Sequence, residues 1–82
     1  MKREERVILI EGRTVAFEPL GNTGEWEVWT RDPSKRLGQT WRGEFHFDLP
    51  LVVDDAEIQF ALRACRAAGI NVRLPLTRDE IN

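Results

Sequence analysis

The chain has 82 residues, of which 41% are hydrophobic and 32% charged, with a net charge of -2 and a pI near 5.4. This balance is typical of one globular domain with a modest core, and it lacks the basic excess of dedicated nucleic-acid binders. No apolar run approaches the roughly 20 residues that span a bilayer, and no signal-peptide cleavage site follows the charged start. We expect a cytoplasmic domain over residues 1–82, with loose tails at residues 1–5 and 76–82.

Two short strands open the predicted sheet. Residues 7–10 form an unbroken apolar run, which is typical of a strand covered on both faces. Glu11-Gly12 predicts a tight turn, and residues 14–18 predict a second strand that ends at Pro19. In a hairpin with this turn, the following residues lie on the face away from the core: Val7, Leu9 and Ala16.

Residues 24–47 contain all three Trp residues, the single His and two of the four Phe residues. Alternation on either side of a turn at Asp32-Pro33-Ser34-Lys35 predicts two strands, and Gly38 predicts a second bend. We expect most of the large side chains to pack in the core from one face of these strands: Trp26, Val28, Trp41, Phe45 and Phe47. Trp29 is the exception, because it stands among the charged residues of the opposite face.

A helix follows a connector that contains Pro50. Asp54 is the predicted N-cap, with Glu57 completing a capping box, and apolar residues from Ile58 to Ala68 recur at three-and-four spacing. Gly69 predicts the C-terminal stop of the helix. Apolar and polar residues alternate again over residues 70–74, which predicts a last strand.

The pattern predicts an α+β fold with an antiparallel sheet of four to five strands and one α-helix on one face, in the chain order ββββαβ. The helix returns the chain, so the last strand is expected beside the first, which gives the strand order 5-1-2-3-4. That order places residues 7–10 in the interior of the sheet. The second face of the sheet has no covering element in this sequence.

This open face is the predicted partner-binding surface. An apolar patch rimmed by charge is typical of an interface, and Trp is among the residues that most often dominate binding. The patch is expected to contain Val7, Leu9, Ala16 and Trp29, with a rim of Glu25, Glu27, Arg31, Arg42 and Glu44. The competing interpretation is that Trp29 lies flat over its neighbours, or that the C-terminal tail covers it.

The residues that could support catalysis are few. Cys65 lies on the apolar face of the helix without a His at helical spacing, which favours a buried apolar role over a nucleophile. His46, with Asp48 two residues on, is too little for a metal site or an acid–base pair. The sequence has no phosphate-binding loop, no G-x-S-x-G and no paired Cys motif. We therefore predict no enzyme, no catalytic residue, no metal and no cofactor.

A basic cluster surrounds the predicted hairpin tip: Lys35 and Arg36, flanked by Arg31 and Arg42. A cluster of this kind at a turn is usually solvated. The alternative is that it contacts phosphates or an acidic protein surface.

About half of the chain resembles the plant AP2/ERF DNA-binding domain. The similar positions are Gly24-x-Trp26, Arg31-Asp32-Pro33-x-Lys35 and Trp41-x-Gly43-x-Phe45, followed by Glu57 and Ala61 on the helix. In that family a three-stranded sheet lies in the DNA major groove with a helix packed behind it. The resemblance implies DNA contacts from Trp29, Arg31 and Arg42. The family's first strand is rich in Arg and Gly, whereas residues 13–18 contain Arg13 as their single basic residue.

The leading hypothesis is a small non-enzymatic interaction module that binds another protein, or itself as a homodimer, through the open face. Inhibitors and accessory subunits, including those of phages and other mobile elements, are chains of this type. The alternative is a nucleic-acid-binding domain that uses the sheet and hairpin. The sequence shows no feature for a membrane or small-molecule partner.

Overall fold

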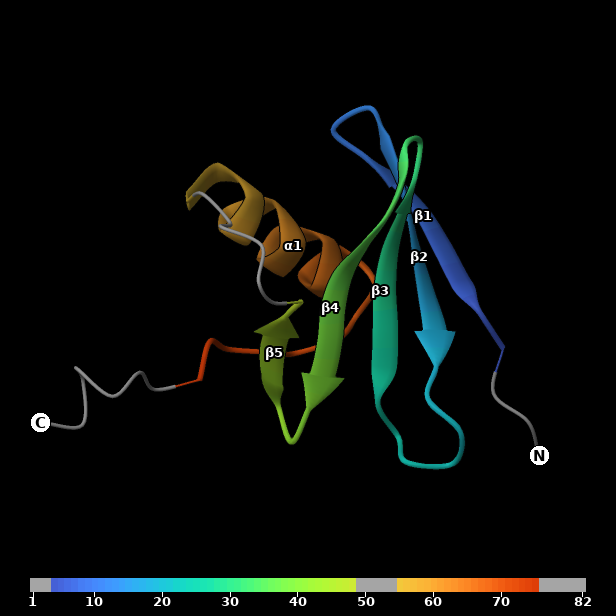
Figure 1. Ribbon diagram of the computed structural model, residues 1–82, viewed down its shortest axis with the longest axis vertical. Coiled ribbons are helices and arrows are strands. Elements are labelled where there is room, and N and C mark those ends of the chain that lie inside the picture. Colours follow the sequence, from blue (N-terminus) through green and yellow to red (C-terminus); the bar gives the residue numbers. More distant parts are fainter. Residues whose placement is uncertain (1–3, 49–54, 76–82) are drawn as a thin grey trace, which may run out of the picture.

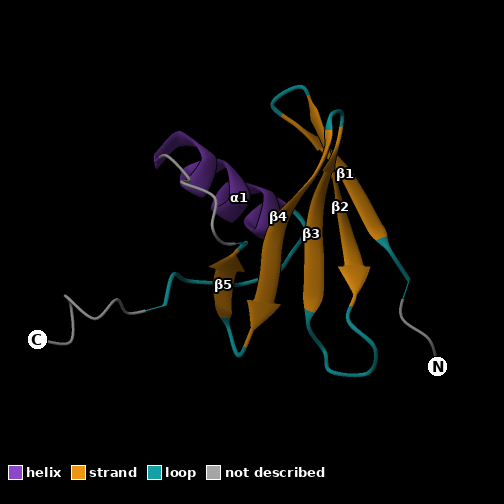
Figure 2. Ribbon diagram, in the orientation of Figure 1, coloured by secondary structure: helices purple, strands orange, loops and turns teal. Residues whose placement is uncertain are grey.

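The computed structural model describes residues 4–48 and 55–75, which form a five-stranded antiparallel sheet with one helix packed on it (Figures 1 and 2). The elements are β1 (Arg6–Ile10), β2 (Arg13–Pro19), β3 (Trp26–Arg31), β4 (Ser34–Trp41), β5 (Glu44–Phe47) and α1 (Asp55–Ala67). The predicted α+β class is therefore confirmed. Within the described ranges, no helix is long and apolar enough to cross a membrane.

The strands lie in chain order, β1-β2-β3-β4-β5, so the predicted order 5-1-2-3-4 is wrong. β1 is an edge strand and not an interior one. Residues 70–74 form no strand beside β1. Arg73 instead makes an isolated parallel bridge to Glu44 on β5, at the opposite edge. Ile70 and Val72 pack against the core from this segment, so their alternation reflects one-sided burial and not a ladder.

The stretch after the β3–β4 turn, which alternation predicts as one strand, is divided into two strands, β4 and β5. Arg42 and Gly43 form a two-residue turn in which both φ angles are positive, 50° and 78°. Turns of this hand match the twist of a β-hairpin. Because the chain reverses there, Trp41 pairs with Glu44 and faces away from the core, and Thr40 pairs with Phe45 on the core side. The predicted core position of Trp41 is wrong, and its side chain is 43% exposed.

The other two hairpins with two-residue turns follow the sequence more closely. Glu11 and Gly12 form the turn between β1 and β2 with φ angles of 52° and 75°, as predicted. The β3–β4 connection is Asp32-Pro33, after which Ser34 begins β4. Gly38 lies inside β4 next to a β-bulge and is buried, so it does not form the predicted second bend.

The core lies between α1 and one face of the sheet. Its fully buried members include Val15, Phe17, Val28 and Phe45 from the strands. The helix contributes Phe60, Ala61, Ala64 and Cys65. The helix ends as predicted, because Gly69 has φ 79° and the Ile70 amide donates to the Cys65 carbonyl at 2.8 Å. The predicted N-cap Asp54 and the predicted tails, apart from Glu4 and Glu5, lie outside the described residues.

Arginine side chains attach the helix to the first hairpin. Arg6 donates to the Ala68 carbonyl at 2.7 Å and lies 4.7 Å from the centre of the Trp26 ring. Arg13 and Glu57 form an ion pair at 3.0 Å. Arg63 binds both carboxylate oxygens of Glu11, at 2.7 and 2.8 Å, which lowers the pKa of Glu11. These contacts place α1 on one face, and the other face is left for the candidate site.

Candidate interaction surface

The face of the sheet opposite α1 carries an apolar strip that follows directly from strand register. Val7 pairs with Ala16, and Ala16 pairs with Trp29, so the three side chains share one face across three strands. Leu9, two residues after Val7, lies on the same face. We call these four residues the open-face strip. Val7 is 52% exposed, Leu9 75%, Trp29 is half-buried, and Ala16 is fully covered by its neighbours.

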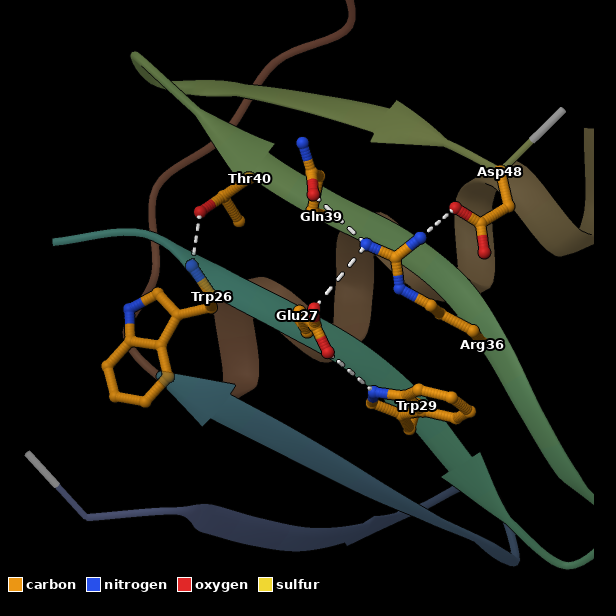
Figure 3. A network of polar contacts seen from close by, with 7 residues as sticks. All are labelled: Trp26, Glu27, Trp29, Arg36, Gln39, Thr40 and Asp48. Atoms are coloured by element: carbon orange, nitrogen blue, oxygen red, sulfur yellow. Dashed lines mark hydrogen bonds and ion pairs between the residues drawn. The ribbon is translucent and has the colours of Figure 1, made fainter. Parts of the chain in front are cut away.

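A polar network borders the strip on the β4 side, where Arg36 pairs with Trp29 in the register. Arg36 contacts the carboxylate of Asp48, the Gln39 amide oxygen at 3.0 Å and Glu27 at 3.8 Å. The Trp29 indole N–H donates to Glu27 at 3.3 Å. Figure 3 shows this network in front of the sheet with α1 behind it. The Glu27 carboxylate therefore orients the indole of Trp29, and Arg36 in turn holds that carboxylate.

Only part of the predicted charged rim borders the strip. Glu27 and Arg31 are on β3 beside Trp29, and Arg31 forms an ion pair with Glu5 at 2.6 Å. Glu25 and Arg42 lie at the other end of the sheet, where the Arg42 backbone N–H donates to the Glu25 carboxylate at 2.8 Å. Glu44 is on β5, at the far edge. Glu25 and Arg42 therefore stabilise the β4–β5 turn and do not frame the strip.

The predicted basic cluster does not form one patch. Lys35 pairs with Thr30, and Arg36 pairs with Trp29, so the two basic residues point to opposite faces. Arg31 and Arg36 are each paired with carboxylates. Arg42 lies at the opposite end of β4, with its guanidinium 5.5 Å from the Trp41 ring centre.

The three residues implied as DNA contacts by the AP2/ERF resemblance are also separated. Trp29 and Arg31 share one face of β3, whereas Arg42 lies in the β4–β5 turn. Glu18 and Glu27 pair directly on the face that carries Trp29. A phosphate backbone on this face would meet these carboxylates.

Sequence reasoning missed several members of this surface. Asp48 and Gln39 complete the Arg36 network, and Trp41 is an exposed aromatic residue on the same face as His46. The dipeptide Arg42-Gly43 was the available signal for Trp41, since a two-residue turn ending in Gly splits an alternating segment into a hairpin. No local signal marks the Arg36–Asp48 pair, because Arg36 lies on β4 and Asp48 directly follows β5.

Cys65 and His46, the two groups that the sequence offered for catalysis, lie in different surroundings. Cys65 is fully buried, and burial raises the pKa of its thiol to about 12. His46 Nε2 lies 3.3 Å from Glu44 Oε1 without the geometry of a hydrogen bond. No group of three or more His, Cys, Asp or Glu side chains among the described residues could hold a metal ion.

Comparisons with known proteins find no matching family model, no matching curated protein and no matching solved structure.

Proposed function

We propose that this protein is a non-enzymatic interaction module that binds a protein partner through the open-face strip. The observation that carries the proposal is the row Val7–Ala16–Trp29 with Leu9 beside it, on the side of the sheet that α1 does not cover. Two of these residues, Val7 and Leu9, are aliphatic side chains more than half exposed at alternate positions of β1. Exposed apolar residues in such a contiguous group are typical of a binding surface.

The chemistry around the strip fits a protein partner. Trp29 presents an indole whose orientation is restricted by Glu27, so little side-chain entropy is lost when it is covered. The Arg36 network supplies a polar margin beside the apolar residues, which is the arrangement of an interface core and its rim. An inhibitor or accessory subunit would use such a surface without catalytic residues of its own.

Nucleic-acid binding, the alternative from sequence, has less support. The arginines on the open face are engaged by carboxylates, and Glu18 and Glu27 add negative charge to that face. Binding of this kind would fall steeply with salt, whereas association through the strip would not.

The test is site-specific photo-crosslinking in the cells that produce the protein. A benzophenone amino acid at Leu9 is expected to trap a discrete protein adduct, because Leu9 is the most exposed residue of the strip. The same probe at Gln59, which is exposed on α1, is the matched control and should trap none. Equal labelling at the two positions would overturn the proposal.

A second substitution tests the role of Trp29. Combining Trp29→Ala with the probe at Leu9 should strongly reduce the adduct, since loss of a binding hot spot weakens association by about 2 kcal/mol or more. In purified components this corresponds to a roughly 30-fold increase in Kd. Unchanged trapping would remove Trp29 from the binding surface.

A further inference from the structure

One side of β1 has no partner strand in the described parts of the chain. β1 pairs with β2 on one side only, and it lies at one end of the strand order (Figure 1). The other edge of the sheet is different, because the Phe45 amide donates to the Arg73 carbonyl and the Arg73 amide donates to the Gly43 carbonyl, both at 2.9 Å. The sheet therefore has one covered edge and one free edge.

The register identifies the backbone groups at this free edge. Ile10 and Arg13 flank a two-residue turn, and the pair that closes such a turn exchanges backbone hydrogen bonds. Hydrogen-bonded and non-hydrogen-bonded pairs alternate along an antiparallel ladder. The amide and carbonyl groups of Val7 and Leu9 therefore point outward, away from β2.

The composition of β1 is unusual for an edge strand. Edges are commonly protected by Pro, Lys, a bulge or an inward-pointing charge, because unpaired strands recruit other strands. β1 reads RVILI, without Pro, Lys or bulge. Its one inward-pointing charge is Arg6, at the first position, which donates to the Ala68 carbonyl, so residues 7–10 carry none of these protecting features. The same apolar run that predicts an interior strand thus stands at an edge. An apolar run of this kind is typical of a strand with a neighbour on each side. Pairing of a further strand with the free side of β1 would therefore explain the composition of β1.

We propose that β1 pairs antiparallel with β1 of a second copy, with Ile8 on the two-fold axis, to form one continuous ten-stranded sheet. In this register Val7 of each copy lies opposite Leu9 of the other, and these are the residues whose backbone groups point outward. Ile8 of one copy lies opposite Ile8 of the other, on the face of the sheet that carries the helices. Each pairing in the centre of the interface joins two aliphatic side chains.

Self-complementarity is the argument for a second copy as the occupant. A two-fold interface requires that one segment match its own reverse, and the run from Val7 to Leu9 does so. The flanking pairs are also compatible. Glu5 would lie opposite Glu11, but Arg31 and Arg63 already pair with these two carboxylates within each chain.

The dimer rests on the proposed function and deepens it, because it brings two open-face strips together. Val7 and Leu9 of both copies would form one apolar patch on the side away from both helices, flanked by Trp29 of each. The free edge of β1 is then covered by β1 of a second copy. The combined apolar patch remains accessible on the open face, for a further protein partner.

The test measures mass in solution by light scattering over a wide range of protein concentration, at low and high salt. The wild-type protein is expected to have twice the 9.5 kDa mass of one chain, with little salt dependence. Leu9→Pro removes an outward amide that β2 does not use, and Pro is tolerated at such edge positions. It should therefore be monomeric with its circular dichroism spectrum retained. Gln59→Ala, at an exposed position of α1 outside β1, is the control and should remain dimeric.

Disulfide trapping tests the register independently of proline. In a Cys65→Ala background, Ile8→Cys should crosslink two copies, since directly opposite residues of a non-hydrogen-bonded pair are about 4.5 Å apart at Cα. Val7→Cys should crosslink poorly, because the two Val7 residues would lie diagonally, about 7–8 Å apart. Preferential crosslinking through Val7→Cys would overturn the register.

The outcomes separate this inference from the proposed function. A wild-type monomer at all concentrations overturns the β1 dimer, and trapping of a different protein at Leu9 would still support the open-face strip. A dimer that Trp29→Ala disrupts and Leu9→Pro does not would also overturn edge pairing, since association would then occur through the face.

Discussion

Gly38 shows how a single residue can take a role that local sequence does not reveal. The sequence predicts a bend there, yet Gly38 is a buried strand residue opposite Phe47, beside the bulge in β4. A side chain at this position would collide with backbone, because an added Cβ would lie 2.2 Å from the His46 carbonyl oxygen and 2.9 Å from Phe47 Cα. Glycine is needed here for space between strands.

Gly38→Ala is therefore expected to destabilise the protein by about 3 kcal/mol or more, since the clashing atoms are mainly backbone and cannot rotate away. Gly21→Ala is the matched control. Gly21 also has a conformation that favours glycine, with φ 52°, but an added Cβ would meet nothing within 4 Å. Gly21→Ala should lower the free energy of unfolding by about 1–2 kcal/mol, through backbone strain alone. Equal losses in urea denaturation would contradict the steric explanation.

At the scale of elements, the helix is the part most completely readable from sequence, but its docking is not. The three-and-four spacing and Gly69 identify α1 and its end, and the structure confirms both. The arginines that attach α1 to the first hairpin come from β1, β2 and the helix itself. Their partners are up to 62 residues away in sequence, as for Arg6 and Ala68. Local periodicity carries no information about such pairs.

Phe60→Ala tests this docking. Phe60 is 4% exposed, and the Arg13 guanidinium lies 3.9 Å from the centre of its ring. Truncation should lower the free energy of unfolding by about 3–5 kcal/mol through lost burial and a cavity. The neighbouring Gln59→Ala, at an exposed position, should change it by less than about 0.5 kcal/mol. A small effect of Phe60→Ala on thermal unfolding would mean that the helix does not pack as described.

At the scale of the whole molecule, stability at high pH is expected to depend on one buried thiol. The chain contains no Tyr, and burial raises the pKa of the Cys65 thiol to about 12. The unfolded chain ionises its thiol near pH 8.5, while the folded chain keeps it protonated. The stability that this difference contributes is fully present below about pH 8.5 and is lost as the pH rises toward 12.

The free energy of unfolding should therefore fall between about pH 9 and 11, with a slope approaching 1.4 kcal/mol per pH unit. Chemical denaturation at a series of pH values measures this slope. Cys65→Ala should remove the thiol's contribution and show a flatter dependence. Rapid labelling of the native protein by a thiol reagent at neutral pH would contradict the burial on which this prediction depends.

The sequence by itself determined the elements whose signals are local. Alternation and periodicity identified the first hairpin, the Trp-rich strand and the helix. The same alternation predicted that Val7, Leu9, Ala16 and Trp29 share one face, and the strand register places them together there. These features depend on residues close in sequence and on burial of one face, which leave a pattern in the chain.

The tertiary structure alone decided strand order, the pairing of the edges and the Arg36 network. Residues 70–74 alternate like a strand but cross to β5, because Ile70 and Val72 are satisfied by the core and Arg73 finds its backbone partners at Gly43 and Phe45. Periodicity reports that a residue is buried on one side and not which neighbour buries it. For that reason the apolar run of β1 predicted an interior strand, and only the fold shows that its second neighbour is not supplied within the described residues.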